Sequence, residues 1–161
     1  MNARNIASWI LALGLAGAFV FMVGLPKFVG PSPNPIFSLI AGRSGIELFE
    51  PYVRYATGAG ELIAAALLIW PASRRFGALL AGAISVGAIG FHLSPWLGIR
   101  LPEMERLVEL LQQGTSVAEI DAMGLPTDGG ALFATALVFL VSAVAVFYLS
   151  NDRVKKSAQA S

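Results

Sequence analysis

The stretch that decides the fold is residues 52–70, which read YVRYATGAGELIAAALLIW. This stretch is long and apolar enough for a helix that crosses a bilayer, which takes about 20 residues. It nevertheless carries Arg54 near its start and Glu61 near its middle. A charge at that depth is costly, and such side chains usually face a bundle interior, a water-filled cavity or a partner. Glu61 is therefore the first candidate for a functional residue.

The rest of the chain has the composition of a membrane protein. Of its 161 residues, 56% are hydrophobic and 13% are charged, whereas roughly a quarter of the residues in soluble domains are charged. Three more windows are almost free of charge and reach bilayer length: 6–25, 76–94 and 130–150. The sequence thus predicts an all-α fold, a four-helix transmembrane bundle that forms a single membrane domain over residues 1–161.

Short interfacial or extracytoplasmic helices are expected in both outer loops, and the first of these loops is 30–51. Its prolines exclude one continuous helix. Asn34 can cap a short helix, and Pro35 suits the first helical position. Gly42 is expected to end this helix, because glycine is the commonest residue just past a helix end.

The second outer loop, 95–129, has the pattern of two short helices. Apolar residues recur at helical spacing between Pro102 and Gly114, with charged residues on the opposite face. Ser116 and Glu119 then have the spacing of a capping box, which marks the start of another helix. Such an apolar stripe usually packs, so a lid over the bundle is the first interpretation and a docking helix for a partner protein the second.

Lysine and arginine near the ends of spans predict the orientation, because these residues stay on the cytoplasmic side. Arg74 and Arg75 fill the short connection between the second and third spans, and the tail 151–161 carries three more basic residues. Both termini are therefore predicted to be cytoplasmic, in a multi-pass protein of the cell's inner membrane. The loops 30–51 and 95–129 would then face outward.

Polar and small residues converge on the outer half of three predicted spans. Arg54, Gly58 and Glu61 follow one another at i, i+4 and i+7, so they share one helical face. Ser85 and His92 share a face of the next span, and Lys27 closes the first span. Together they form the candidate ligand-binding set: Glu61, His92, Arg54, Lys27, Ser85 and Gly58.

Each of these polar groups needs a partner away from lipid. We therefore expect Glu61 and His92 to face one interior cavity, open toward the outer leaflet and covered by one of the outer loops. The alternative for Glu61 is a structural acid that is hydrogen-bonded to the backbone, or that pairs with Lys27 or Arg54 and ties the spans together. The alternative for His92 is an interfacial polar residue, and for Gly58 a packing position.

Several chemistries are excluded by residue counts. The chain has no cysteine and one histidine, which excludes disulfides, iron–sulfur clusters, covalent c-type haem and thiol relays. A single histidine also excludes most multi-histidine metal sites, so no metal is expected. A net charge of +1 gives no electrostatic attraction to nucleic acid. The expected partners are the lipid bilayer, a small apolar ligand and another protein.

The sequence resembles the DoxX family of small, four-span bacterial and archaeal membrane proteins. The resemblance covers residues 6–94. It is carried by GLPKF at the end of the first span and by RYATGAGELIAAALLIWPASRRFGALLAGAISVGAIGFHL across the second and third. Within these, the most recognisable elements are Lys27 with Phe28, the TGxxE that contains Glu61, GALL, and the AxxxH that ends at His92.

The resemblance implies a function linked to quinones and redox chemistry. The family's namesake is a subunit of a thiosulfate:quinone oxidoreductase, and other members are linked to oxidative stress and thiol redox assemblies. The expected function is an accessory or quinone-binding subunit of a membrane redox complex, at most part of an oxidoreductase, without a redox metal, thiol or covalent cofactor of its own. In that function Glu61 would accept a proton, and His92 with Arg54 or Lys27 would polarise a ligand oxygen. A transporter for a small or lipid-like solute and a non-enzymatic assembly scaffold are the alternatives.

Overall fold

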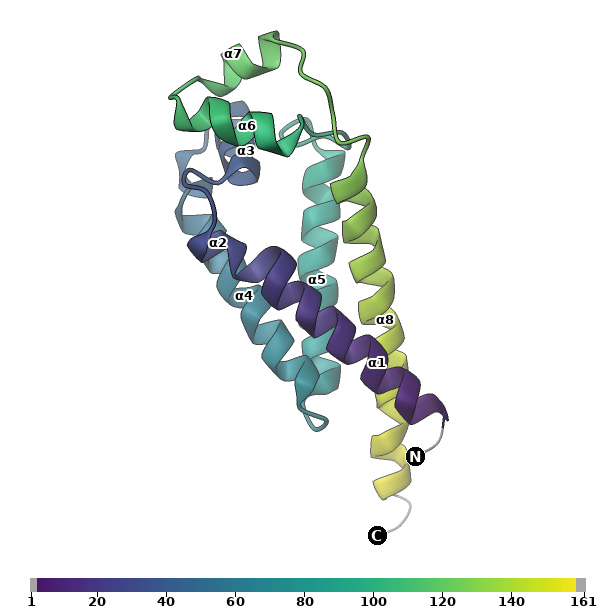
Figure 1. Cartoon of the computed structure of the whole chain (residues 1–161). Coiled ribbons are helices and arrows are strands. Elements are labelled where there is room, and N and C mark those ends of the chain that lie inside the picture. The colour runs from purple at the N-terminus through teal and green to yellow at the C-terminus, as the bar shows by residue number, and fades with distance from the viewer. Residues whose placement is uncertain (1–2, 159–161) are drawn as a thin grey trace.

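Long helices form the body of the molecule, and short helices cover one end of it (Figure 1). The computed structural model describes the backbone of residues 3–158 and the side chains of residues 3–150. The body consists of α1 (Ala3–Ala18), continued by the π-helical turn η1 (Phe19–Gly24) and α2 (Pro26–Val29), and of α4 (Tyr52–Ile69), α5 (Arg74–Leu93) and α8 (Ala131–Ala158). The cover consists of α3 (Pro35–Ser44), the 3-10 turn η2 (Glu47–Phe49), α6 (Met104–Gln112) and α7 (Val117–Ala122).

The all-helical prediction is confirmed for the described residues, and three helical segments are long and apolar enough to cross a membrane. These segments are Ala3–Val29, Arg74–Leu93 and Ala131–Ser150. The remaining long helix, α4, contains Arg54 and Glu61 together with two glycines and a threonine. These residues lower the mean hydropathy of α4 below that of the other three segments. The same residues make α4 a candidate for function.

Helix bounds differ from the expected spans mainly at the two chain ends. The first helical segment reaches Val29 instead of residue 25, because η1 and α2 continue it and Pro26 occupies the first position of α2. The last helix extends through Ala158, so most of the segment 151–161, expected as a tail beyond the last span, is helical. The structure does not describe the side chains of this segment, nor the backbone of residues 159–161. The prediction for the basic residues of the tail therefore falls outside the described part of the chain.

The body is apolar on the outside and carries polar groups inside. Large hydrophobic side chains such as Phe21, Ile63 and Val141 are exposed, while Arg54, Glu61, Arg74, Ser85 and His92 are among the buried polar residues. Soluble proteins rarely expose large contiguous apolar surfaces. This distribution fits a protein that is surrounded by lipid along its body.

Small residues pack one half of the body tightly, and we call it the closed half. Its core is rich in alanine, and α1, η1, α4, α5 and α8 contribute to it: Ala12, Leu15, Ala16, Phe19, Ala64, Ala65, Leu68, Ala78, Ala81, Ala143 and Val146. A Cβ on Gly77 would lie 2.6 Å from the backbone nitrogen of Leu68, so α5 meets α4 here backbone to backbone. From this contact α4 and α5 diverge toward the covered end (Figure 1).

The short helices form a second hydrophobic core, which we call the cap. Leu39 and Ile40 of α3 pack there with residues of the second outer loop, including Leu107, Leu110 and Ile120. The Oδ1 atom of Asn34 accepts hydrogen bonds from the backbone N–H groups of Ile36 and Phe37, as expected for a helix that starts at Pro35. The capping box of Ser116 and Glu119 is also present.

The end of α3 was predicted wrongly. This helix passes Gly42 and ends before Gly45, whose φ of 72° lies in the left-handed region that glycine adopts without strain. Gly42 serves packing instead, because a Cβ there would lie 2.6 Å from a methyl group of Val117 in α7.

Candidate functional site

A cavity of about 480 Å³ lies where α4 and α5 have diverged, in what we call the open half of the body. Residues of α4, α5 and α8 form its walls, η1 and α2 close one side, and Ile36, Phe37 and Ile40 of α3 form its roof. The roof therefore comes from the first outer loop, one of the two expected covers. Most of the wall is aliphatic or aromatic, and its polar members are Lys27, Thr57, Glu61, Ser85, His92 and Thr135.

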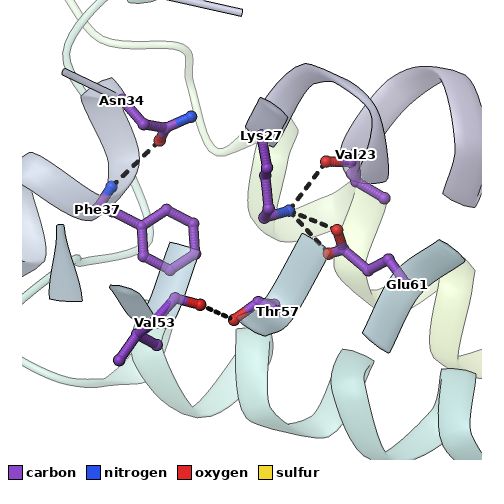
Figure 2. A network of polar contacts seen from close by, with 7 residues as sticks. All are labelled: Val23, Lys27, Asn34, Phe37, Val53, Thr57 and Glu61. Carbon is purple, nitrogen blue, oxygen red and sulfur yellow. Dashed lines mark hydrogen bonds and ion pairs between the residues drawn. The ribbon is translucent and has the colours of Figure 1, made fainter. Parts of the chain in front are cut away.

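An ion pair between Lys27 and Glu61 lies in this wall (Figure 2). The Nζ atom of Lys27 donates to both carboxylate oxygens of Glu61, at 2.8 and 2.7 Å, and to the carbonyl oxygen of Val23 at 3.0 Å. The same atom lies 5.8 Å from the centre of the Phe37 ring, a favourable position for a cation. The pair thus joins the end of the first helical segment to the middle of α4.

Two glycines allow Lys27 to reach Glu61. A Cβ on Gly58 would lie 2.8 Å from the Phe28 ring and 3.1 Å from the Cβ atom of Lys27. A Cβ on Gly24 would lie 2.9 Å from the Leu62 side chain. Both glycines therefore let the first helical segment approach α4 closely enough for the ion pair, which is the packing alternative considered for Gly58.

His92 lines the same cavity from α5 and is 6% exposed. Its Nδ1 atom lies 2.8 Å from the carbonyl oxygen of Gly98. A carbonyl oxygen can only accept, so Nδ1 carries the hydrogen, and in the neutral ring Nε2 is left as an acceptor. The ring also meets Phe133 of α8 edge to face, with centroids 5.7 Å apart. These contacts hold the imidazole in one orientation in the cavity wall.

Three hydroxyl groups complete the polar part of the wall. Ser85 lies on α5 and is 2% exposed, Thr57 lies one turn before Glu61 on α4, and Thr135 lies on α8. Sequence reasoning missed both threonines. Thr57 had a signal, since it shares a helical face with Glu61 at i and i+4. Thr135 had none, because nothing in the last span marks the face that meets the cavity.

Four of the six candidate residues therefore lie together, namely Lys27, Glu61, Ser85 and His92. Gly58 supports the site from behind, as described above. Arg54 lies elsewhere: its guanidinium pairs with Glu50 at 3.1 Å, donates to the hydroxyl of Tyr55 at 2.7 Å and donates to the carbonyl oxygen of Pro31 at 3.4 Å. Glu50 in turn accepts from the backbone N–H of Asn34. Arg54 thus fixes the first outer loop on the start of α4 and is absent from the cavity wall.

The cavity reaches the surface of the body between α4 and α5. Ala56 of α4 and Gly87 of α5 both line it, and both are exposed. A Cβ on Gly87 would meet no atom within 4 Å. Small residues on both helices therefore leave an opening on the side of the molecule, on the apolar surface that would face lipid.

Asp128 stabilises the cap near His92. Its side chain accepts hydrogen bonds from the backbone N–H groups of Leu101, Gly130 and Leu132, at 2.9, 2.9 and 3.1 Å. Burial alone would raise the pKa of Asp128, but these hydrogen bonds outweigh it and lower the pKa below its usual value. Asp128 therefore joins the end of the second outer loop to the start of α8.

Comparisons of the chain with protein-family models, with curated proteins and with solved structures find no match. Within the described part of the chain, no group of three or more histidine, aspartate or glutamate side chains is placed to hold a metal ion. The candidate site is a largely apolar cavity with an ion pair, an imidazole and hydroxyl oxygens in its wall.

Proposed function

We propose that this protein is a four-span membrane protein whose cavity binds a membrane-soluble ligand of the quinone class, as an accessory subunit of a membrane redox complex. The observation that carries the proposal is the cavity itself. Its volume of about 480 Å³ lies in the range of small-molecule sites, which are mostly apolar with a few fixed polar groups. A quinone has the same division, with a polar head and an apolar tail.

The fourth span in this proposal is α4. Its polar side chains Arg54 and Glu61 are buried, while Tyr52, Ile63 and Trp70 at its ends and middle are exposed. Charged residues inside membranes face the bundle interior and pair with one another, as Glu61 does with Lys27. An inward polar face and an outward apolar face support α4 as a helix within the bilayer.

The proposed orientation places the cap outside the cell membrane and both termini in the cytoplasm. In support, α1 begins and α8 ends at the end of the body opposite the cap (Figure 1). Arg74 and Arg75 lie at that same end, where basic residues favour the cytoplasmic side. The chain has no cysteine of its own, so a Gln112→Cys variant can be labelled selectively. Labelling of intact cells by a membrane-impermeant maleimide is expected, and protection until lysis would contradict the orientation.

The side opening supports a ligand that arrives from the bilayer. The opening between α4 and α5 lies on the apolar surface of the body, where a membrane-soluble ligand would meet it. The polar groups in the wall are held in place by the helices and by the ion pair, so the site is formed before a ligand binds. The resemblance of residues 6–94 to the DoxX family points to the same ligand class and to a redox complex as the partner.

Tryptophan fluorescence offers a direct test of the ligand class. The Trp96 ring lies 6.4 Å from the ring of Phe91, centre to centre, and Phe91 lines the cavity, whereas Trp9 and Trp70 lie in or near the closed half. In a Trp9→Phe, Trp70→Phe variant held in lipid nanodiscs, a short-chain benzoquinone should quench Trp96 saturably. The reciprocal variant, with Trp96→Phe and the other two tryptophans retained, is the control and should show only weak, linear quenching. Linear quenching of Trp96 itself would contradict the proposal.

A further inference from the structure

The hydroxyl groups in the cavity wall have already used their hydrogens. Thr57 donates to the carbonyl oxygen of Val53 at 2.7 Å, Ser85 to that of Ala81 at 2.8 Å, and Thr135 to that of Ala131 at 2.9 Å. A hydroxyl group has one hydrogen and two lone pairs. Each of these side chains therefore presents only lone pairs, and hence only an acceptor, to a molecule in the cavity.

The N–H groups of Lys27 and His92 in the wall also donate their hydrogens within the protein. The ammonium group of Lys27 has three hydrogens and contacts three acceptors, the Val23 carbonyl and the two oxygens of Glu61. His92 uses its Nδ1–H on the carbonyl oxygen of Gly98, which leaves the Nε2 lone pair. Among the described side chains that line the cavity, acceptors are therefore available and no donor is left over.

We infer that the cavity selects a ligand whose polar head donates hydrogen bonds, so that within the quinone class it binds the reduced quinol in preference to the quinone. This inference rests on the proposed function. The hydroxyl groups of a quinol can donate to the lone pairs of Thr57, Ser85, Thr135 or His92. The carbonyl oxygens of a quinone can only accept, so they would meet other acceptors and leave both sides without a partner in an apolar cavity, which is costly.

The placement of the acceptors strengthens this inference. They come from three helices around the cavity: Thr57 from α4, Ser85 and His92 from α5, and Thr135 from α8. Ser85 and His92 are more than nine-tenths buried, so water cannot easily take the place of a missing partner. A site that rejects a ligand lacking the matching donor uses the same physics as enzymes that discriminate substrates by one hydroxyl group.

Calorimetric titration with one short-chain benzoquinone and its own quinol tests the inference, since the two forms share one carbon skeleton. The protein is held in lipid nanodiscs, and the quinol is kept reduced under argon. We expect the quinol to bind about tenfold more tightly than the quinone, as hydrogen bonds of this kind are worth about 1.4 kcal/mol, a factor of ten in affinity.

A matched variant identifies the acceptors. Thr57→Val and Thr135→Val keep the shape of each side chain and remove its oxygen, and Ser85→Ala removes the third hydroxyl. The triple variant should bind the quinone at least as tightly as the wild type does, because the opposing oxygens are gone, and bind the quinol less tightly, so the preference falls toward unity. If the triple variant does not fold, Thr57→Val alone should show part of the same loss.

The outcomes separate this inference from the function on which it rests. Equal affinity for the two forms, or tighter binding of the quinone, overturns the inference and leaves the quinone-class site in place. A full quinol preference that persists in the triple variant also overturns it, because the three hydroxyl oxygens would then play no part in the selection. Binding of neither form overturns the proposed function itself.

Discussion

The closed half and the open half of the body are built from the same helices, yet they bury their polar groups in different ways. In the closed half, the guanidinium of Arg74 donates to the carbonyl oxygen of Leu68 and the hydroxyl of Ser8, and it lies 3.8 Å from the centre of the Trp9 ring. The hydrophobic core of this half is rich in alanine. In the open half, the ion pair of Lys27 and Glu61 lies beside a cavity, and oxygen and nitrogen lone pairs face that cavity.

The difference shows what side-chain size does in a helical bundle. Alanine and glycine on facing helices let backbones approach, as at Gly77, and leave no room for a ligand. Where α4 and α5 diverge, larger side chains such as Ile84 and Phe91 line a cavity instead. The same small residues at Ala56 and Gly87, on the surface of the open half, make an opening instead of a contact.

The largest expected effect comes from removing the charge on Glu61. In Glu61→Gln the ammonium group of Lys27, whose side chain is 12% exposed, stays buried without a counter-charge. Breaking a buried pair in this way costs about 3–5 kcal/mol. We expect a loss of that size in the free energy of unfolding, measured by denaturant titration in detergent micelles.

A double variant provides the control for this experiment. Lys27→Met with Glu61→Leu removes both charges and keeps similar volume, and it should recover most of the lost stability. An unchanged free energy of unfolding in Glu61→Gln would show that water or lipid head groups reach Lys27. The claim that the open half buries an ion pair would then be contradicted.

Alanine substitutions at two glycines of α5, one in each half, compare how tightly the two halves are packed. Gly77→Ala places a Cβ atom 2.6 Å from the Leu68 nitrogen and 2.8 Å from the Leu67 carbonyl carbon, so the backbones must separate. Overpacking of this kind costs about 1–3 kcal/mol. Gly87→Ala meets no atom within 4 Å and should change stability by no more than about 0.5 kcal/mol. Equal losses in thermal unfolding would mean that the open half is packed as tightly as the closed half.

A smaller effect is expected in the cap as the pH falls. Because the pKa of Asp128 is lower in the folded protein than in the unfolded chain, its contribution to stability is complete above the unfolded value of about 3.9 and is lost as the pH falls through the folded value. Glu119, whose pKa is lowered by its hydrogen bonds with Ser116, acts in the same direction. Thermal unfolding between about pH 6 and about pH 3 should show this loss.

Asp128→Asn is the matched variant for the pH experiment. It keeps the side-chain shape and one oxygen acceptor but has no carboxyl group to titrate. Its stability should fall less steeply than that of the wild type over the same interval. Parallel pH profiles would show that the hydrogen bonds from Leu101, Gly130 and Leu132 do not depend on the charge of Asp128.

Local signals in the sequence account for much of the fold. Asn34 before Pro35 and the capping box at Ser116 lie within a few residues of the helix starts that they determine. The end of α3 was predicted wrongly because the role of Gly42 depends on Val117, which is distant in the sequence. Local patterns thus predict where helices lie. Which of two nearby glycines ends a helix depends on contacts between helices.

The candidate site was predictable only where local sequence patterns determine it. The position of Glu61 in an apolar stretch is enough to place it inside the protein, and its helical face could be read from the spacing. Its partner could not be chosen among Lys27, Arg54 and His92, because that choice depends on how helices cross. Arg54 has Glu50 one turn away and pairs with it, whereas Gly24 and Gly58 bring Lys27 to Glu61.

The central claim is that the open half holds a ligand in a space that the closed half lacks, and a cavity-filling variant tests it most directly. Ala88 lines the cavity from α5, and Ala88→Phe would place a ring in that space without touching the closed half. The measurement is saturable quenching of Trp96 by a short-chain benzoquinone in the wild type and in this variant. We expect the variant to fold with unchanged or higher thermal stability and to lose saturable quenching. A folded Ala88→Phe protein that binds the quinone as the wild type does would contradict the account.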